Sequence, residues 1–564
     1  MTNDVERSNK EAVAGQSLSK TLPLGDAIRR HIRPGMAIHL AAGIGGPSAA
    51  ICELIRQFKG TNPNFTIVQS TMSGHALNLV HCGVVKRLIC AACIDISDSS
   101  RPSKIIQRAL ADHEIELKNW SLCSLQQRLM AGAFGFPFIP TRSVIGSSIA
   151  GDHPDSFRIV EDPFDATSTF GVVKSLNPDI SIVHACAADE EGNLILSAPY
   201  GDDIWGSFAS TGGVLATVEA IVPTDVIRKY AALVKIPGYL VKSVSVAPFG
   251  AHPFSLTNPG IDEFIAYEKD TEFLKILHKS SSDKNALEEW LRVWVEDCTN
   301  HLQYLEKLGS ERLDVLKYRL TGKRESLSPV TAVAPQDIVR EVTDEEMMLV
   351  MVAREVYKSV QENGHRTILA GAGAGATAAW LAYYQLKAEG YDDIELITGN
   401  GLIGYSPLPG QSVLSSEAGV RTAKFLTDTV TTHGVLVGGK NSRCLSVLGA
   451  GQIDKYGNIN STKTASGAFL VGSGGGNDAV NAREVVVTLK QSKDRFAETL
   501  PFITGRGDAV TTVVSTMGVF RKSGAGESLV LKSCSPFAMD IDDPNRASVP
   551  RLGSPFSRSS TFIT

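Results

Sequence analysis

The 564-residue sequence lacks a strong excess of charge of either sign. It contains 55 lysine and arginine residues against 60 aspartate and glutamate residues, which gives a formal net charge of -5. No cluster of basic residues stands out, and a nucleic-acid-binding surface normally needs one. We therefore expect no nucleic-acid partner.

Long apolar runs are also missing. The sequence has no stretch of about 18 consecutive apolar residues, the minimum for a membrane-spanning helix, so no membrane contact is expected. Residues 1–20 are polar and lack the apolar core of a secretory signal peptide. These two absences favour a cytoplasmic protein.

Cysteine is sparse, with nine residues scattered along a long chain. This pattern is not that of a disulfide framework and is typical of a reducing compartment. Cys90 and Cys93 lie three residues apart inside an apolar run, but no second pair of ligands follows at zinc spacing. We interpret the pair as part of a buried strand and expect no metal site.

The sequence does contain a repeated pattern of predicted elements, and it is long enough for more than one hydrophobic core. A strand, a glycine loop, a helix and a second strand are predicted twice, at 36–42, 43–47, 48–58 and 65–69, and again at 367–370, 371–375, 376–387 and 394–397. Each set is one βαβ unit. The sequence therefore predicts an α/β protein with two similar open domains, each with a mostly parallel sheet and helices packed on it.

The segment between the two units differs in composition. Residues 310–340 are charged, lose hydrophobic periodicity and contain Ser-Pro and Ala-Pro dipeptides, so we interpret them as a linker. The expected organisation is a disordered tail at 1–20, a first domain at 21–309, this linker, a second domain at 341–545 and a flexible tail at 546–564.

The last predicted strand runs into a glycine-rich turn, Glu395-Leu-Ile-Thr-Gly-Asn-Gly-Leu-Ile-Gly404. Glycines at 399, 401 and 404 let the backbone turn sharply and approach a ligand closely. The segment resembles the active-site turn of family I CoA-transferases, in which a glutamate attacks an acyl-CoA. Asn400 and Gly401 match that pattern, but Gly399 stands where the family has the glutamate.

The resemblance extends along most of the chain, with matching segments at 128–142, 217–219, 247–253, 395–404, 449–460 and 472–478. In order and length the chain resembles the α and β subunits of the glutaconate CoA-transferase branch fused together. This resemblance implies an enzyme that transfers CoA between carboxylic acids. Acyl-CoA and a carboxylic acid acceptor would be its substrates, no cofactor would be bound permanently, and the chain would form a homodimer.

The resemblance also implies which backbone groups face the thioester. Family members hold the oxyanion with backbone amides of glycine-rich loops, a contribution of about 3 kcal/mol per donor. By position, the oxyanion and CoA-binding residues are Gly43, Gly45, Gly46, Asn400, Gly401, Gly474, Gly475, Gly476 and Asn477. A structural role in tight turns would need many of the same glycines.

Gly399 has no side chain and cannot form the glutamyl intermediate, which leaves three alternatives. Another carboxylate, such as Glu417, could replace it. Activated water could instead hydrolyse an acyl-CoA or a C–C bond, as in a steroid-ring hydrolase that resembles this branch. Candidate bases are then His75 and Glu116, although Glu116 falls several residues before the family's position. The third alternative is a non-catalytic acyl-CoA binder.

Two expectations complete the sequence-based hypothesis. If the scaffold is otherwise intact, replacement of Gly399 by glutamate should create or raise CoA transfer.

Residues 434–440, Gly-Val-Leu-Val-Gly-Gly-Lys, resemble a phosphate-binding loop, but Asn441 follows where that motif needs serine or threonine. We interpret the segment as a strand and a turn without nucleotide chemistry.

Overall fold

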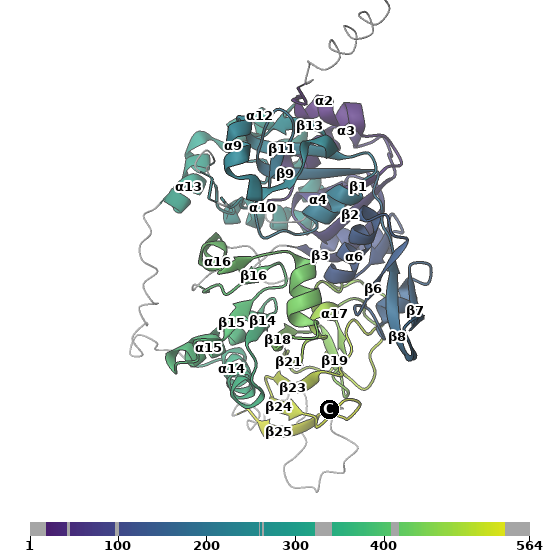
Figure 1. Cartoon of the computed structure of the whole chain (residues 1–564), viewed down its shortest axis with the longest axis vertical. Helices are drawn as coiled ribbons and strands as arrows, with labels where there is room; N and C mark the ends of the chain where they lie inside the picture. Colours follow the sequence, from purple (N-terminus) through teal and green to yellow (C-terminus); the bar gives the residue numbers. More distant parts are fainter. Residues whose placement is uncertain are drawn as a thin grey trace, which may run out of the picture.

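The computed structural model describes residues 19–41, 45–95, 101–258, 260–261, 264, 266–321, 341–407 and 417–535. They form two α/β halves, which lie one above the other in Figure 1, the first in purple to teal and the second in green to yellow. None of the described helices is long and apolar enough to cross a membrane.

The first half is built on a ten-stranded sheet. Its parallel strands lie in the order β13 (Val241–Val246), β11 (Val214–Ile221), β9 (Ile180–Ala188), β1 (Ala37–Leu40), β2 (Phe65–Met72), β3 (Val85–Asp95) and β5 (Glu116–Asn119). Antiparallel strands extend it: β10 (Leu194–Ile195), β12 (Val234–Ile236) and β4 (Arg101–Pro102). Every residue of β9 is buried, as expected for a parallel strand covered on both faces.

Helices connect these strands and pack on the sheet. They are α2 (Leu24–His31), α3 (Ser48–Phe58), α4 (His75–His81), α5 (Lys104–Ala111), α6 (Leu122–Ala133), α7 (Ser148–Asp152), α8 (Asp203–Ala209), α9 (Thr224–Lys229), α10 (Thr271–Ser281), α11 (Lys284–Leu291), α12 (His301–Leu308) and α13 (Ser310–Thr321). Short turns η1 (Ala231–Leu233), η2 (Gly238–Leu240) and η3 (Arg292–Glu296) lie between them. A separate three-stranded sheet, β6 (Phe138–Thr141), β8 (Asp165–Lys174) and β7 (Phe157–Asp162), lies at one side in Figure 1.

The second half has a nine-stranded sheet with the order β17 (Phe425–Leu426), β16 (Leu402–Ile403), β15 (Glu395–Ile397), β14 (Thr367–Ala370), β18 (Cys444–Gly449), β21 (Glu484–Thr488), β23 (Val510–Ser515), β24 (Gly518–Arg521) and β25 (Val530–Cys534). A small sheet contains β20 (Ile459–Asn460), β19 (Gln452–Asp454) and β22 (Phe496–Ala497). Its helices are α14 (Asp344–Asn363), α15 (Ala374–Ala388), α16 (Glu417–Thr422), η5 (Thr431–Val437) and α17 (Gly476–Ala479). A Thr343–Glu346 capping box starts α14, and left-handed Gly364 ends it.

The two sheets share one arrangement of parallel strands. The order β13-β11-β9-β1-β2 of the first half corresponds to β23-β21-β18-β14-β15 of the second. In each, the first strand is central, its βαβ partner lies on one side and three later strands lie on the other. The predicted α/β class with two similar halves is confirmed, but only the first sheet is mostly parallel: the second is mixed, with four parallel and four antiparallel strand pairings.

The boundary between the halves differs from the expected one. The linker was predicted to begin at 310, but α13 continues to Thr321. Leu316 is buried in a first-half core with Tyr267, and its carbonyl accepts from the Glu268 amide, so this burial keeps the segment helical. Residues 322–340 lie outside the described part of the chain, as do 1–18 and 536–564, which hold most of the expected tails. Residue 20 of the expected first tail is paired, because its carbonyl accepts from the Val244 amide of β13.

Candidate active site between the two halves

The glycine-rich turn connects β15 and β16 and lies against the first half of the chain. Gly401 has a φ of +103°, and a Cβ atom there would lie 2.4 Å from the Thr427 carbonyl oxygen and 3.2 Å from Pro199, so only glycine fits. The side chain of Asn400 accepts a hydrogen bond from Thr398 Oγ1 within the same turn. The Tyr200 amide donates to the Thr427 carbonyl at 3.0 Å, which ties the turn to the first half.

Gly399 lies against a buried histidine. A Cβ atom at residue 399 would lie only 2.7 Å from His433 Nε2, which is closer than real Cβ atoms approach. A Cβ atom at Gly475, in the second glycine-rich loop, would lie 2.8 Å from the same nitrogen. The His433 ring therefore occupies the space where side chains at 399 and 475 would start. The structure adds a condition to the expectation that glutamate at 399 creates CoA transfer, because the His433 ring would have to move aside.

His433 belongs to η5, a π-helical turn, and is 4% exposed. Neither of its ring nitrogens has a hydrogen-bond partner within the described residues. Burial lowers the pKa of His433 below its ordinary value of 6.5, and the Asp478 carboxylate opposes that shift only in part. The imidazole is consequently neutral at pH 7, with a ring nitrogen that can accept a hydrogen bond.

A cavity of about 290 Å³ lies beside this histidine. Side chains from both halves line it, among them Cys123, Gln127, Arg142 and Ser143 from the first half and His433 and Asn481 from the second. Arg142 Nη1 donates to the Gly438 carbonyl at 2.8 Å and so bridges the two halves at the cavity. A complete cavity thus needs both halves.

Asp478 and Asn477 hold the two sides of the cavity together. Asp478 accepts from Ser121 Oγ at 2.7 Å, the Cys123 amide at 2.9 Å and Ser143 Oγ at 2.6 Å. Asn477 Oδ1 accepts from the Val144 amide at 2.7 Å, and its Nδ2 donates to the Thr504 carbonyl at 2.8 Å. Sequence similarity suggests Asn477 as a CoA-binding residue, and the structure places its amide in contacts between the halves.

The predicted oxyanion glycines lie in two places. In the second half, the amides of Gly401, Gly474 and Gly476 donate to the carbonyls of Thr398, Ala91 and Ser473, respectively. These bonds hold the loops in shape, and an oxyanion role for the amides stays a prediction. In the first half, Gly45 packs against Leu256 and the Gly46 carbonyl accepts from the Ser48 amide, whereas Gly43 lies outside the described residues.

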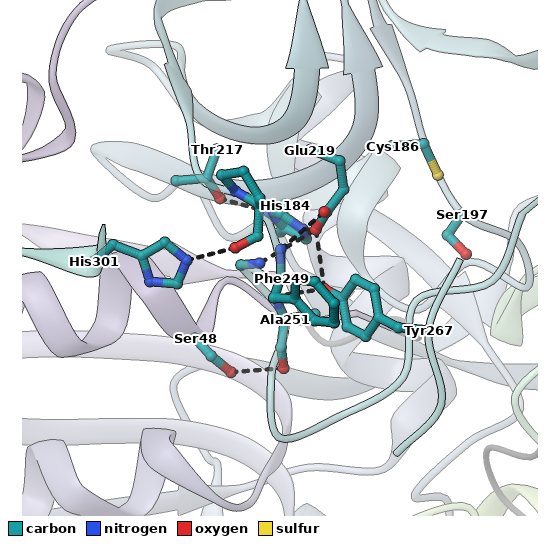
Figure 2. A network of polar contacts seen from close by, with 12 residues as sticks. Ser48, His184, Cys186, Ser197, Thr217, Glu219, Phe249, Ala251, Tyr267 and His301 are labelled. Carbon is teal, nitrogen blue, oxygen red and sulfur yellow. Dashed lines mark hydrogen bonds and ion pairs between the residues drawn. The ribbon is translucent and has the colours of Figure 1, made fainter. Parts of the chain in front are cut away.

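The 249–251 segment, which packs against the start of α3, is held by a largely buried carboxylate, Glu219, whose side chain is 9% exposed (Figure 2). Glu219 accepts from His184 Nε2 at 2.8 Å and Tyr267 OH at 3.0 Å, and from the amides of Phe249 at 2.8 Å and Gly250 at 3.2 Å. Two carbonyls of the same segment accept hydrogen bonds from the start of α3. The Gly250 carbonyl accepts from the Ala49 amide, and the Ala251 carbonyl accepts from Ser48 Oγ at 3.1 Å. This Glu219 cluster (His184, Glu219, Tyr267 and the 249–250 amides) fixes the segment against the start of α3.

Neither Glu116 nor His75 is among the residues that line the cavity. Glu116, on β5, is ion-paired with Arg87 at 2.6 Å and Lys118 at 2.9 Å, and its side chain is 42% exposed. His75 is 1% exposed and packs between the rings of Phe273 and Trp290, and burial lowers its pKa to about 3. Glu417 begins α16, and its side chain is outside the described part of the chain.

Sequence reasoning missed His433 and Cys123. The segment after His433 was predicted to be a strand and a turn, because Val-Leu-Val is typical of strands, but the structure makes it the π-helical turn η5. No motif joins residue 433 to residue 399 in the sequence; only the fold does. Among the described residues, no group of three or more His, Cys, Asp and Glu side chains could hold a metal ion.

Part of the chain is similar to known coenzyme A transferases. Residues 22–247 match the family model described as coenzyme A transferase. The chain is 27% identical over 320 residues to one of the subunits of glutaconate CoA-transferase from Acidaminococcus fermentans, across 53% of this chain and 95% of that protein. It is 26% identical over 308 residues to the IpdA component of the cholesterol ring-cleaving hydrolase of Rhodococcus jostii, across 52% and 97%.

Among solved structures, the thioester complex with CoA of the acyl-CoA transferase YdiF from E. coli O157:H7 aligns with a TM-score of 0.61. The identity is 18%, and the alignment covers 91% of this chain and 89% of that one. Since it extends over both halves, the two proteins share the whole two-domain fold.

Proposed function

We propose that this chain, which is similar to coenzyme A transferases over residues 22–247, is an acyl-CoA-processing enzyme that delivers the acyl group to water. Similarity to CoA-transferase subunits supports the substrate class. The ring-cleaving hydrolase among its relatives supports water as an acceptor in this superfamily. In this proposal an α-like and a β-like part are fused, and CoA enters only as part of the substrate.

The observation that carries the choice of water is the contact between residue 399 and His433. Glycine supplies no carboxylate, and the imidazole lies 2.7 Å from the place of a Cβ atom. A glutamyl intermediate at this position therefore has neither a nucleophile nor room. Water needs only a small space, and the neighbouring cavity of about 290 Å³ far exceeds the roughly 15 Å³ that one molecule requires.

A second candidate is CoA transfer between two carboxylic acids bound at the same time. The alignment that covers 95% of a glutaconate CoA-transferase subunit favours it. So does the Arg142 guanidinium at the cavity, which donates to the Gly438 carbonyl through Nη1 and could hold a carboxylate with its other N–H groups. For either reaction we propose a homodimer in the cytoplasm. The remote alternative is that the chain binds acyl-CoA without turnover. Light scattering of the purified chain tests the dimer.

The deciding experiment is mass spectrometry of the full-length protein incubated with a panel of acyl-CoAs in H₂¹⁸O, with and without acetate or succinate. Hydrolysis gives free CoA without an acceptor and one ¹⁸O atom in the released acid. Transfer gives a new acyl-CoA only when the acceptor is present. Formation of neither product from any thioester would contradict an enzymatic role and leave binding alone.

A further inference from the structure

We propose that His433 is the catalytic base of this enzyme and that Gly399 and Gly475 are small in order to make room for its ring. The inference rests on the proposed hydrolysis and adds the residue that activates the water. It thereby explains the missing glutamate: the site replaces a carboxylate nucleophile on one strand with an imidazole supplied by another segment.

The position of the ring is the first argument. His433 Nε2 lies 2.7 Å and 2.8 Å from the places where Cβ atoms at 399 and 475 would stand. The imidazole is thus inserted between the two glycine-rich loops that the family resemblance assigns to the thioester. Any larger residue at either position would displace it, so the two glycines and the histidine form one matched arrangement.

The absence of hydrogen bonds is the second argument. The His433 side chain is 4% exposed, lines the cavity, and has no partner for Nδ1 or Nε2 within the described chain. Buried polar groups are normally hydrogen-bonded, and an exception calls for an explanation such as strain, a bound water or a catalytic role. A water molecule or substrate in the adjoining cavity provides one.

Burial keeps the ring in the neutral form that a base requires, and the Asp478 carboxylate favours the imidazolium that forms when the ring takes a proton. The titratable and charged side chains near it are Asp478 on α17, Cys123 on α6 and Arg142 at the cavity. Burial is the dominant effect and lowers the pKa of His433, so the ring is neutral at physiological pH. A neutral imidazole can remove a proton from water, as general bases do.

The reaction balances without another reactant. His433 removes one proton from water while the water oxygen bonds to the thioester carbonyl carbon, whose π electrons move to the oxygen. Collapse of this oxyanion restores the carbonyl and breaks the C–S bond. The sulfur leaves with the bonding electrons and takes the proton back from the imidazolium, which yields a carboxylic acid and free CoA.

Cys123 is the rival for the catalytic role, as a thiol nucleophile on the same cavity. Burial and the Asp478 carboxylate raise the pKa of Cys123 well above its ordinary value, so the sulfur is a thiol rather than a thiolate. No hydrogen bond joins it to His433, whose nitrogens are both unpaired within the described residues. A cysteine–histidine pair is therefore not formed.

The test uses the full-length protein and the thioester that the wild type hydrolyses fastest. His433→Ala should lower kcat by about 100- to 10,000-fold with little change in KM, and added imidazole should restore part of the activity. The low-pH fall in wild-type kcat/KM should lie below pH 6.5 and be missing in the variant. His433→Phe, which keeps a ring in place, provides the inactive variant if alanine impairs folding.

His75→Ala is the matched control, because it also removes a buried histidine. Any activity that it loses should not return with imidazole, and its low-pH fall should remain. Full activity of both His433 variants, or an acyl-cysteine at Cys123 that disappears in Cys123→Ser, would overturn the inference. Wild-type protein that releases no CoA into water would instead refute the proposed hydrolysis itself, so the two failures are distinguishable.

Discussion

Glu219 is largely buried and His433 is buried, and the two groups differ in their hydrogen bonds. Glu219 accepts from two side chains and two backbone amides. His433 has no partner at either ring nitrogen within the described residues. A buried group with all its partners stabilises the fold, whereas an unpaired one costs stability that a bound water or ligand can offset. We accordingly assign a structural role to Glu219 and a chemical one to His433.

The largest effect that would test this comparison is the loss of the Glu219 carboxylate. Glu219→Ala leaves His184, Tyr267 and two amides without their acceptor, so the free energy of unfolding should fall by about 3–5 kcal/mol. Urea unfolding measures this value. Glu219→Gln keeps one acceptor oxygen, so its free energy of unfolding should fall by less than that of Glu219→Ala. A change below about 1 kcal/mol for alanine would contradict the structural role, since it would fall within the effect of ordinary surface substitutions.

The next effect concerns the space that His433 occupies. Gly399→Glu should overpack the site and lower the free energy of unfolding by about 1–3 kcal/mol without forming a glutamyl-CoA adduct. The double variant Gly399→Glu/His433→Gly removes the clash. It should regain stability and form the adduct, which intact-protein mass spectrometry detects after incubation with acyl-CoA.

The matched control is Gly399→Gln/His433→Gly, which has the same volume at 399 and no nucleophile, so no adduct should form. An adduct in the single variant Gly399→Glu would mean that the ring moves aside easily. His433 would then not determine the chemistry at this position, and the contrast with Glu219 would lose its basis.

Much of the fold could be predicted from local sequence, because strand-like apolar runs and glycine loops recur in the same order. Helix α3 spans the predicted 48–58, and β14 spans the predicted 367–370. His433 could not be predicted, since it reaches Gly399 only through packing of segments that are far apart in the sequence. Glu116 and His75 have suitable side chains, but an exposed ion pair and an aromatic core surround them, and only tertiary structure reveals that.

The second half contains a counterpart of the Glu219 cluster, which predicts a pH dependence of stability. Glu484 accepts from Ser359, Asn363 and His365 at one oxygen and Thr511 at the other. Burial alone would raise its pKa, but these hydrogen bonds outweigh burial and lower the pKa to about 2, from an ordinary value of 4.5. The carboxylate therefore stabilises the fold above about pH 4.5, and this contribution is lost as the pH falls toward 2.

Urea unfolding at a series of pH values checks this prediction. The free energy of unfolding of the wild type should decline more steeply between pH 4.5 and 2 than that of Glu484→Gln, which cannot titrate at this position. Parallel curves would mean that the Glu484 carboxylate is not stabilised by its four donors. Saturated hydrogen bonding would then be a poor sign of a structural role, in this half and at Glu219.

The smallest effect is expected at Glu116, whose side chain is 42% exposed and does not line the cavity. Exposed ion pairs such as those with Arg87 and Lys118 contribute only about 0–1 kcal/mol. Glu116→Gln should therefore change the free energy of unfolding by less than about 1 kcal/mol. Because Glu116 does not line the cavity, kcat and KM for acyl-CoA hydrolysis should match the wild type. A large fall in kcat with unchanged stability would place the base on the first half of the chain, and the unpaired state of His433 would then need a different explanation.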